Sequence, residues 1–133
     1  MTDVENGTVL CFDFGLARTG VAIGNTLTRT ARPLEIIHAQ TNDARWKAVD
    51  RLVREWAPVY FVVGLPMHAD GTPSALTARC ERFARQLGGR YLRAAYLENE
   101  RGTSKAVERG REYIDDAAAA LILQQFFDKR PEE

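Results

Sequence analysis

The chain has 133 residues, 45% hydrophobic and 27% charged, a balance typical of one soluble domain with its own core. Its 18 basic and 18 acidic residues give a formal net charge of zero, which argues against a protein that holds nucleic acid by bulk positive charge alone but leaves a local basic patch open. No apolar run reaches the roughly 18 residues of a membrane span, and the first residues are polar and acidic rather than signal-like, so we expect a cytoplasmic protein without a membrane partner.

The first part of the chain predicts three consecutive strands. Apolar runs over 8–14 and 18–24 are separated by a short turn, and a third run is strongest over 34–38. Pro33 fits the start or the edge of a strand, because proline has no N–H to donate to a neighbouring strand. Three strands without an intervening helix predict an antiparallel meander.

A helix and a buried strand follow the meander. Apolar residues from Trp46 to Trp56 recur at helical spacing, with Asn42 or Asp43 as the start signal. We expect Trp46 and Trp56 to lie in the core rather than to stack on bases. The run 59–63 is apolar throughout, as in strands of parallel sheets whose two faces are both covered. The chain therefore changes here from a meander to alternating helices and strands.

The predicted second helix has Thr72 as its N-cap, Pro73 in its first position, and Gly88-Gly89 at its end. A strand over 91–97 comes next. A short helix over 103–111 and a last, largely apolar helix from about 115 to 127 complete the chain. Without the short helix the order is β-β-β-α-β-α-β-α.

This order predicts the α/β class: a mixed five-stranded sheet with helices on both faces. We expect a single domain over 1–133, with its core at 8–127 and tails at 1–7 and 128–133. Cys11 and Cys80 lie in apolar patterns without the spacing of metal ligands, so both are expected to be small buried hydrophobes.

Polar clusters follow three of the predicted strands. Asp13 comes after the first strand, the loop 64–72 after the fourth, and Glu98 and Glu100 after the fifth. In open α/β sheets, sites lie beyond the carboxyl ends of the strands. This convergence is the best physical indication of a functional site in the sequence.

Asp13, Glu100 and Asp115 would suit a metal site if the fold brings them together. Carboxylates that share a pocket need protons or cations to coexist. Their hard oxygen atoms are ligands that Mg²⁺ and Mn²⁺ prefer. Two such ions roughly 4 Å apart would clamp the attacking water and the leaving oxygen of a phosphodiester.

The same residues also have structural interpretations. Asp13 can cap the turn of a tight hairpin, and Arg18 either grips a phosphate or neutralises Asp13. Asp115 and Asp116 both suit a helix start, where a side chain caps the helix and negative charge is favourable. His68 is either a proton carrier or phosphate contact, or an ordinary exposed histidine.

The acidic turn after the fifth predicted strand also has a purely structural interpretation. Glu98 and Glu100 suit a solvated turn, with Arg101 as a salt-bridge partner. Pattern alone does not separate this interpretation from a ligand role.

Taken together and in order, the motifs of residues 8–127 resemble the YqgF family, also called the RuvX-like or pre-16S rRNA nuclease family, which has an RNase H-like fold. The matching pieces are Phe12-Asp13-Phe14-Gly15, Arg18-Thr19-Gly20-Val21-Ala22, Thr30-Ala31-Arg32-Pro33-Leu34, Val62-Val63-Gly64-Leu65-Pro66, Asp70-Gly71-Thr72, Asn99-Glu100-Arg101, Thr103-Ser104, Ile114-Asp115-Asp116-Ala117-Ala118-Ala119 and Ile122-Leu123.

The resemblance implies a metal-dependent endonuclease that trims the 5′ end of the 16S ribosomal RNA precursor during ribosome maturation. It implies that Asp13, Glu100 and Asp115 are the catalytic acids and hold Mg²⁺ or Mn²⁺. It also implies an RNA substrate, possibly structured DNA, and a ribosomal particle as a further partner. The protein would act as a monomer or a weak homodimer.

The resemblance also places residues along the substrate. These are Arg18, Gly64, Pro66, Asp70, Thr72 and Arg101. The chain departs from the family pattern at Asn99, where the family usually has aspartate, so a charge beside Glu100 is lost. The segment between Ser104 and Ile114 is shorter than usual and keeps few basic residues.

Three other functions remain open from the sequence. The same fold hosts Holliday-junction resolvases, which need a two-fold dimer to make paired cuts. A non-catalytic RNA- or ribosome-binding factor would bind RNA without its carboxylates. A phosphate-binding ATPase core is disfavoured, because the chain is too short for two lobes and has no second Asp-x-Gly loop.

Overall fold

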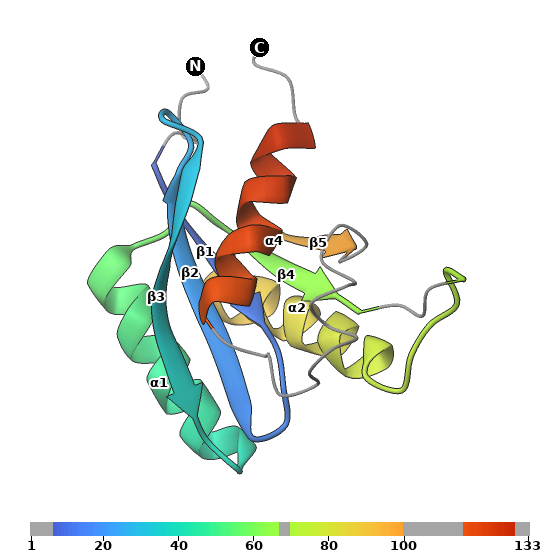
Figure 1. Cartoon of the computed structure of the whole chain (residues 1–133). Coiled ribbons are helices and arrows are strands. Elements are labelled where there is room, and N and C mark those ends of the chain that lie inside the picture. Colours follow the sequence, from blue (N-terminus) through green and yellow to red (C-terminus); the bar gives the residue numbers. More distant parts are fainter. Residues whose placement is uncertain (1–6, 67–69, 100–115, 130–133) are drawn as a thin grey trace.

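The structure, a computed structural model, describes residues 7–66, 70–99 and 116–129. Five strands form one sheet in the order β3-β2-β1-β4-β5 (Figure 1). The elements are β1 (Thr8–Asp13), β2 (Arg18–Asn25), β3 (Thr30–His38), α1 (Asn42–Trp56), β4 (Tyr60–Leu65), α2 (Thr77–Tyr91), β5 (Ala95–Asn99) and α4 (Asp116–Lys129).

The sheet is mixed, as the sequence predicts. β1, β2 and β3 pair antiparallel, whereas β4 pairs parallel with β1 on one side and with β5 on the other. β3 is an edge strand, and Pro33 stands in it opposite Ala22, where its missing N–H costs no hydrogen bond in the middle of a sheet. The α/β fold class and the edge position of Pro33 are therefore confirmed.

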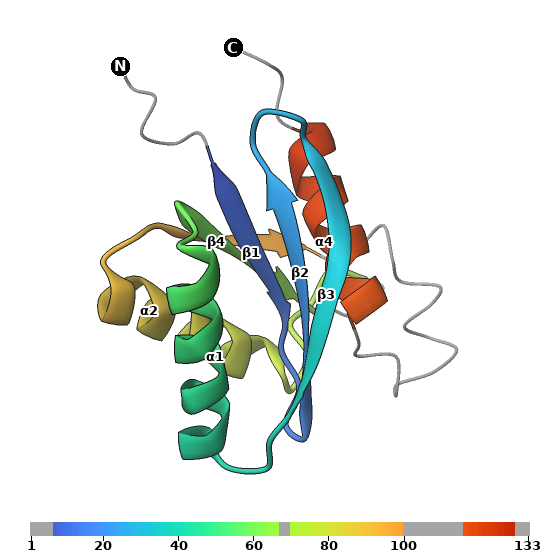
Figure 2. The same cartoon turned by 90° about the vertical axis from the view of Figure 1, so that its left-hand side faces the viewer.

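Helices cover both faces of the sheet, as Figure 2 shows, with α1 and α2 on one side and α4 on the other. The side chains of β1 alternate between these faces. Leu10 and Phe12 pack with α1 and α2, whereas Val9 and Cys11 pack under α4. Both cysteines are buried, as expected.

An aromatic cluster fixes α1 and α2 to the sheet. The ring of Phe83 on α2 lies 5.4 Å from Phe12, 5.1 Å from Phe14 and 5.1 Å from Trp46, measured between ring centroids. Trp46 is buried, and Trp56 packs against the same core. The expectation that both tryptophans serve the core is confirmed.

The start of α2 differs from the prediction. The helix begins at Thr77 rather than after Thr72, because the Asp70 carboxylate accepts both the N–H and the hydroxyl of Thr72 (3.0 and 2.7 Å) and holds it in a turn. Leu76 is the N-cap of the helix, and just before it the Ser74 side-chain oxygen accepts the Leu76 N–H at 3.2 Å.

The end of α2 also differs. The helix continues through Gly88-Gly89 to Tyr91 and ends at Leu92, which takes the left-handed conformation with φ 56°. Tyr91 favours this longer helix, because its ring packs 5.8 Å from Phe61 and its hydroxyl reaches Asp50. β5 consequently starts at Ala95 and not at position 91, and it runs on to Asn99.

The C-terminal boundary also lies later than expected. α4 continues past residue 127 to Lys129, so Asp128 and Lys129 are helical rather than part of a tail. Asp116 is the first residue of α4, where its negative charge stabilises the helix N-terminus. This placement agrees with the helix-start interpretation of Asp116. The predicted helix over 103–111 lies outside the described residues.

Candidate active site

Asp13 ends β1 at the carboxyl edge of the parallel strands and is 6% exposed. By the alternation along β1, it follows Val9 and Cys11 on the face that α4 covers. The apolar run that precedes Asp13 forces the chain into the centre of the sheet, so the carboxylate is carried into a largely buried position. Burial of this kind requires compensating polar or cationic groups.

Glycines stand on both sides of Asp13 in the sheet. Gly20 is its partner on β2, and on the other side Phe12 pairs with Val63, so that Gly64 is level with Asp13. Neither neighbour carries a side chain, and the α4 face therefore has no bulky group beside the carboxylate in this row. Gly64 pairs in turn with Glu98 on β5, which completes the row.

Arg18 lies near Asp13 in the strand pattern, two residues before its partner Gly20. It starts β2, and because β2 runs antiparallel to β1, this start lies at the edge where β1 ends. Arg18 is two residues before Gly20 and so lies on the same face of the sheet. Both sequence interpretations, phosphate contact and neutralisation of Asp13, remain compatible with this placement.

Glu98 is not the solvated turn residue that the sequence suggested. It lies inside β5 and is 4% exposed. Its carboxylate accepts a hydrogen bond from the Gln125 side chain at 2.6 Å and pairs with the Lys129 ammonium at 2.9 Å, both from α4. Because these partners occupy it, Glu98 anchors the end of α4 to the sheet.

The proposed substrate residues of the 64–72 loop separate into two groups. Gly64 and Pro66 lie at the end of β4, where the Pro66 carbonyl accepts the Thr77 hydroxyl at 2.6 Å. Asp70 and Thr72 lie in an exposed loop that extends away from the sheet (Figure 1). The structure therefore keeps the first pair near Asp13 and does not bring Asp70 or Thr72 to it.

Glu100, Arg101 and Asp115, together with His68, lie outside the described residues. Within the described ranges no group of three His, Cys, Asp or Glu side chains is placed to hold a metal ion. Asp13 supplies one carboxylate of the expected set. A set of three carboxylates has the hard oxygen chemistry that Mg²⁺ and Mn²⁺ require.

Arg45 is a buried residue beside the site that the sequence analysis did not single out. It is 3% exposed, and its Nη2 donates to the Leu16 carbonyl at 2.6 Å, in the turn that follows Asp13. Its Nη1 donates to the Asn42 side-chain oxygen at 2.7 Å. A signal was present, because Arg45 precedes Val49 by four residues and so falls on the buried stripe of α1.

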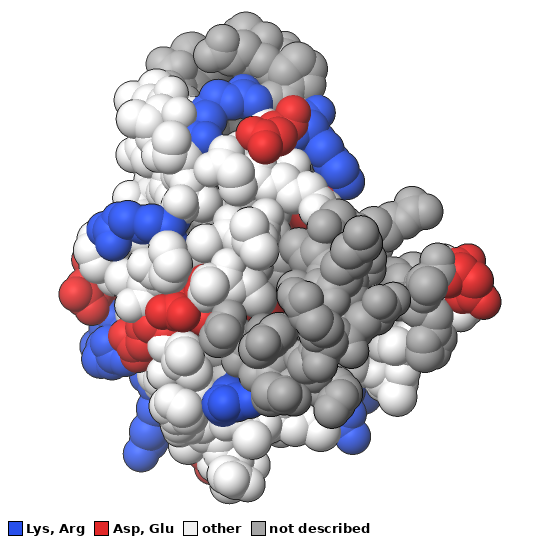
Figure 3. Space-filling view, viewed as in Figure 1, with Lys and Arg blue, Asp and Glu red and all other residues white. Residues whose placement is uncertain are grey.

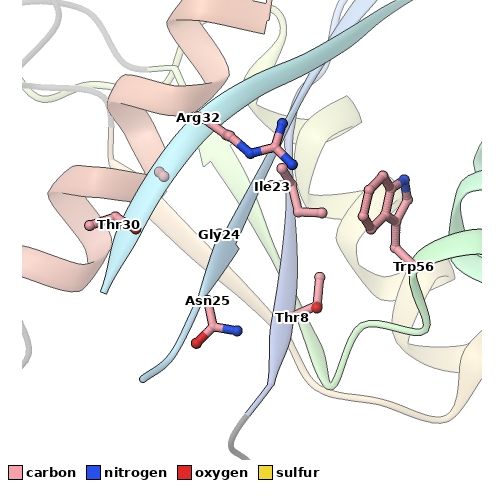
Figure 4. Close-up of a pocket in the computed structure, with 8 residues that line it drawn as sticks. Thr8, Ile23, Gly24, Asn25, Thr30, Arg32 and Trp56 are labelled. Carbon is pink, nitrogen blue, oxygen red and sulfur yellow. The ribbon is translucent and has the colours of Figure 1, made fainter. Parts of the chain in front are cut away.

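A separate pocket of about 250 Å³ lies at the start of β1, the opposite end of the strand from Asp13 (Figure 4). Its lining includes Thr8, Asn25, Arg32 and Trp56. Since Asp13 ends the same strand, this pocket is not part of the candidate active site.

Charges of both signs are interspersed over the described part of the α4 face (Figure 3). This pattern agrees with the zero net charge of the chain. Within the described residues, no helix is long and apolar enough to cross a membrane.

Comparisons with known proteins place the chain in a family. A family model described as RuvX, Holliday junction resolvase, matches residues 7–129. A protein of Bordetella petrii named "Putative pre-16S rRNA nuclease" is 50% identical over 127 residues, covering 93% of this chain and 97% of its own. A protein of the same name from Thiobacillus denitrificans is 43% identical over 142 residues, covering 98% of both chains.

Solved structures support the fold. RuvC of T. thermophilus in complex with a Holliday junction substrate matches with a TM-score of 0.57 and 15% identity, over 93% of this chain and 95% of that one. Fowlpox virus resolvase in complex with Holliday junction DNA matches with a TM-score of 0.57 and 9% identity, over 92% and 97%. With its RNase H-like sheet, the buried Asp13 at the end of β1 and a family match over residues 7–129, the chain belongs to the RuvX family and is a nuclease.

Proposed function

We propose that this nuclease is a divalent-metal-dependent endonuclease that processes the 5′ end of precursor 16S ribosomal RNA. The observation that carries the proposal is the buried Asp13 at the carboxyl end of β1, between the glycine positions 20 and 64. Relatives that are 43–50% identical over nearly the whole chain are named "Putative pre-16S rRNA nuclease". A ribosomal particle is the proposed setting, and the cytoplasm the proposed compartment.

Asp13, Glu100 and Asp115 are the proposed metal ligands and catalytic acids. When bound, Mg²⁺ or Mn²⁺ supplies Lewis-acid chemistry at the scissile phosphodiester. Asp13 is held in place by its strand, because the ladder to Gly20 fixes its backbone. A rigid strand is a better platform for a ligand than a loop, since misplacement costs catalytic efficiency.

Substrate positioning is proposed for Arg18 and for the end of β4, Gly64 and Pro66. Arg18 lies at the same edge and on the same face as Asp13, and its guanidinium suits a phosphate oxygen. The absence of a side chain at Gly64 allows an RNA backbone to approach the row closely. Arg101, Asp70 and Thr72 are proposed as outer contacts.

A Holliday-junction resolvase is the second candidate function. The description of the matching family model and the two solved resolvases favour it. Paired cuts in a four-way junction need a two-fold dimer, whereas trimming an RNA end needs one active site. A non-catalytic RNA- or ribosome-binding factor is the third candidate.

Cleavage of matched substrates separates these functions. A 5′-extended 16S precursor RNA and a four-way DNA junction are incubated with the protein and Mg²⁺, Mn²⁺ or EDTA. We expect cutting of the RNA with either metal and none with EDTA. Cutting of the junction alone would assign the protein to the resolvases, and RNA binding without cutting would assign it to the non-catalytic factors.

A further inference from the structure

A small pocket lies between α1 and α2, beside the turn that follows β1. Its volume is about 90 Å³, far below the roughly 300–1,000 Å³ of sites for drug-sized molecules. Three aromatic rings, those of Phe14, Trp46 and Phe83, line it. Phe14 directly follows Asp13 in the sequence but packs in the core under α1 and α2, so the pocket lies on the opposite face of the sheet from the Asp13 carboxylate.

Arg45 lies in the wall of this pocket with its charge buried. The residue is 3% exposed, and the acceptors of its guanidinium are backbone carbonyls and the Asn42 amide, with no carboxylate among them. Its Nε has no hydrogen-bond partner within the described part of the chain. A buried cation without a counter-charge is costly, and a bound anion would remove that cost.

Two further arginines complete the rim from α2. Arg79 and Arg82 line the pocket, are exposed, and form no ion pair with a carboxylate of the described residues. No aspartate or glutamate among the described residues lines the pocket. Arg90 adds a fourth guanidinium nearby, stacked 4.0 Å over the Trp46 ring. The described lining of the pocket therefore carries three arginines and no carboxylate in a chain whose net charge is zero.

We infer that this pocket binds one phosphate group of the RNA backbone. The inference rests on the proposed function, because it takes RNA as the substrate. Arginine is the side chain best suited to phosphate, since its planar guanidinium can donate two parallel hydrogen bonds. The pocket is small enough for a phosphate, and because it lies on the opposite face of the sheet from Asp13, the phosphate that it binds is one away from the scissile bond.

A purely structural role explains only part of this arrangement. Arg45 ties the β1–β2 turn to α1 through the Leu16 carbonyl, and that contact needs only Nη2. It does not explain the unpartnered Nε or the two α2 arginines on the same pocket. A phosphate in the pocket would account for the two α2 arginines and would balance the buried charge of Arg45.

The test compares RNA binding by two double variants that remove the same charge from α2 or its vicinity. Arg79→Gln with Arg82→Gln alters the pocket, and Arg85→Gln with Arg93→Gln is the control, since Arg85 and Arg93 line other parts of the surface. Fluorescence anisotropy with single-stranded precursor RNA in EDTA measures binding without cleavage. We expect the pocket variant to bind about tenfold more weakly and the control to bind as the wild type does.

The salt dependence of binding provides a second readout. For single-stranded RNA, loss of the contact with one phosphate makes the slope of the log binding constant against the log salt concentration less steep by about 0.7. Inorganic phosphate provides a third, because Trp46 lines the pocket and Trp56 does not. Phosphate should shift the Trp46 indole N–H resonance in the wild type and in the control, and not in the pocket variant.

The outcomes separate the pocket from the proposed function. Equal RNA affinity in both double variants overturns the inference, and a Trp46 shift by phosphate in that case indicates a site for the free ion only. If the wild type cleaves no precursor with metal but the pocket variant still binds RNA more weakly than the control, the proposed function is refuted and the inference about the pocket stands. Intact precursor cleavage with pocket-independent binding refutes the pocket alone.

Discussion

Glu98 is a buried carboxylate whose charge is balanced by a lysine that is half exposed. Glu98 is 5% exposed at its side chain and Lys129 53%, with 2.9 Å between their charged atoms. Lys129→Met leaves the carboxylate buried without its counter-charge, so we expect it to lower the free energy of unfolding by about 2–3 kcal/mol. Denaturant unfolding monitored by circular dichroism measures this.

Glu98→Gln is the matched variant for this pair. Once the carboxylate is gone, Lys129 can turn to water, and the glutamine keeps a hydrogen-bonding group toward Gln125. The expected cost is therefore below about 1 kcal/mol. A Glu98→Gln variant that is less stable than Lys129→Met would contradict this account of the pair.

At the residue scale, the burial of Asp13 could be predicted from the sequence and the burial of Glu98 could not. Asp13 ends an apolar run, so its burial could be predicted from the residues next to it. Glu98 is buried by Gln125 and Lys129, which are 27 and 31 residues away in sequence, and local pattern gives no information on such partners. The placement of Glu100 and Asp115, which lie outside the described residues, remains a prediction from the resemblance.

The packing of α4 on the sheet depends on Gly24 in β2. A Cβ at this position would lie 2.8 Å from Leu123 Cδ2, from Phe127 Cε2 and from the Thr30 carbonyl oxygen. Gly24→Ala must push α4 away, so we expect a loss of about 1–3 kcal/mol in the free energy of unfolding. Thermal and denaturant unfolding would detect the change.

Gly89 is the control glycine for this prediction. It lies within α2, and a Cβ there would meet nothing within 4 Å. Gly89→Ala should therefore raise the free energy of unfolding by about 0.5–1 kcal/mol, because alanine loses less backbone entropy in a helix. Equal effects of the two substitutions would show that the close contact at Gly24 does not limit α4 packing.

Tyr91 links the end of α2 to α1 and makes this link sensitive to high pH. Its hydroxyl donates to Asp50 at 3.3 Å. Burial, and then the negative charge of Asp50, raise the pKa of the Tyr91 phenol above its ordinary value of 10. The resulting stabilisation is fully present below pH 10 and is lost as the pH rises through the raised pKa of the folded state.

Tyr91→Phe keeps the ring and removes the titrating group. At pH 7 we expect the variant to be about 1 kcal/mol less stable than the wild type, because a hydrogen bond is removed. Above pH 10 the difference should shrink, since only the wild type loses the Tyr91 contribution. Urea unfolding at pH 7 and at pH 11 tests this, and a difference that grows with pH would refute it.

At the element scale, α2 shows what local signals cannot decide. Thr72, Pro73 and Gly88-Gly89 are good helix boundaries by composition, yet the helix runs from Thr77 to Tyr91. The Asp70 carboxylate accepts a hydrogen bond from the Thr72 hydroxyl, and Tyr91 packs on Phe61, which is 30 residues earlier. Tertiary contacts therefore overrode local preference at both ends. The bounds of α1 lie close to the predicted ones, although Thr41 is its N-cap rather than Asn42 or Asp43.

For the whole molecule, the order of helices and strands along the chain and the mixed sheet could be predicted, because periodicity changes clearly along the chain. Three strands without helices and then alternating elements left few ways to build one sheet, and the mixed sheet with both faces covered is confirmed. The single-domain organisation over 1–133 remains a prediction. The full active site could not be assembled in the same way, because its acids are far apart in sequence.

The oligomeric state is a prediction for the whole molecule. Trimming of an RNA end by one active site requires one protomer, so we expect a monomer in sedimentation experiments at assay concentration. The cleavage rate should then rise in proportion to the protein concentration. A dimer, with a rate that rises as the square of the concentration below its dissociation constant, would favour the resolvase function.

The central claim is that Asp13 is a catalytic acid of a metal-dependent RNA nuclease. Asp13→Asn keeps the size of the side chain and removes its charge, and Asp116→Asn is the control, because Asp116 starts α4. Precursor RNA cleavage with Mg²⁺ is measured for both variants, with thermal unfolding to show that they fold.

We predict that Asp13→Asn lowers the cleavage rate by a factor on the order of 10³ or more, which corresponds to about 4 kcal/mol of lost transition-state stabilisation. Asp116→Asn should leave the cleavage rate within about twofold of the wild type. Cleavage by folded Asp13→Asn at the rate of the wild type would contradict the account.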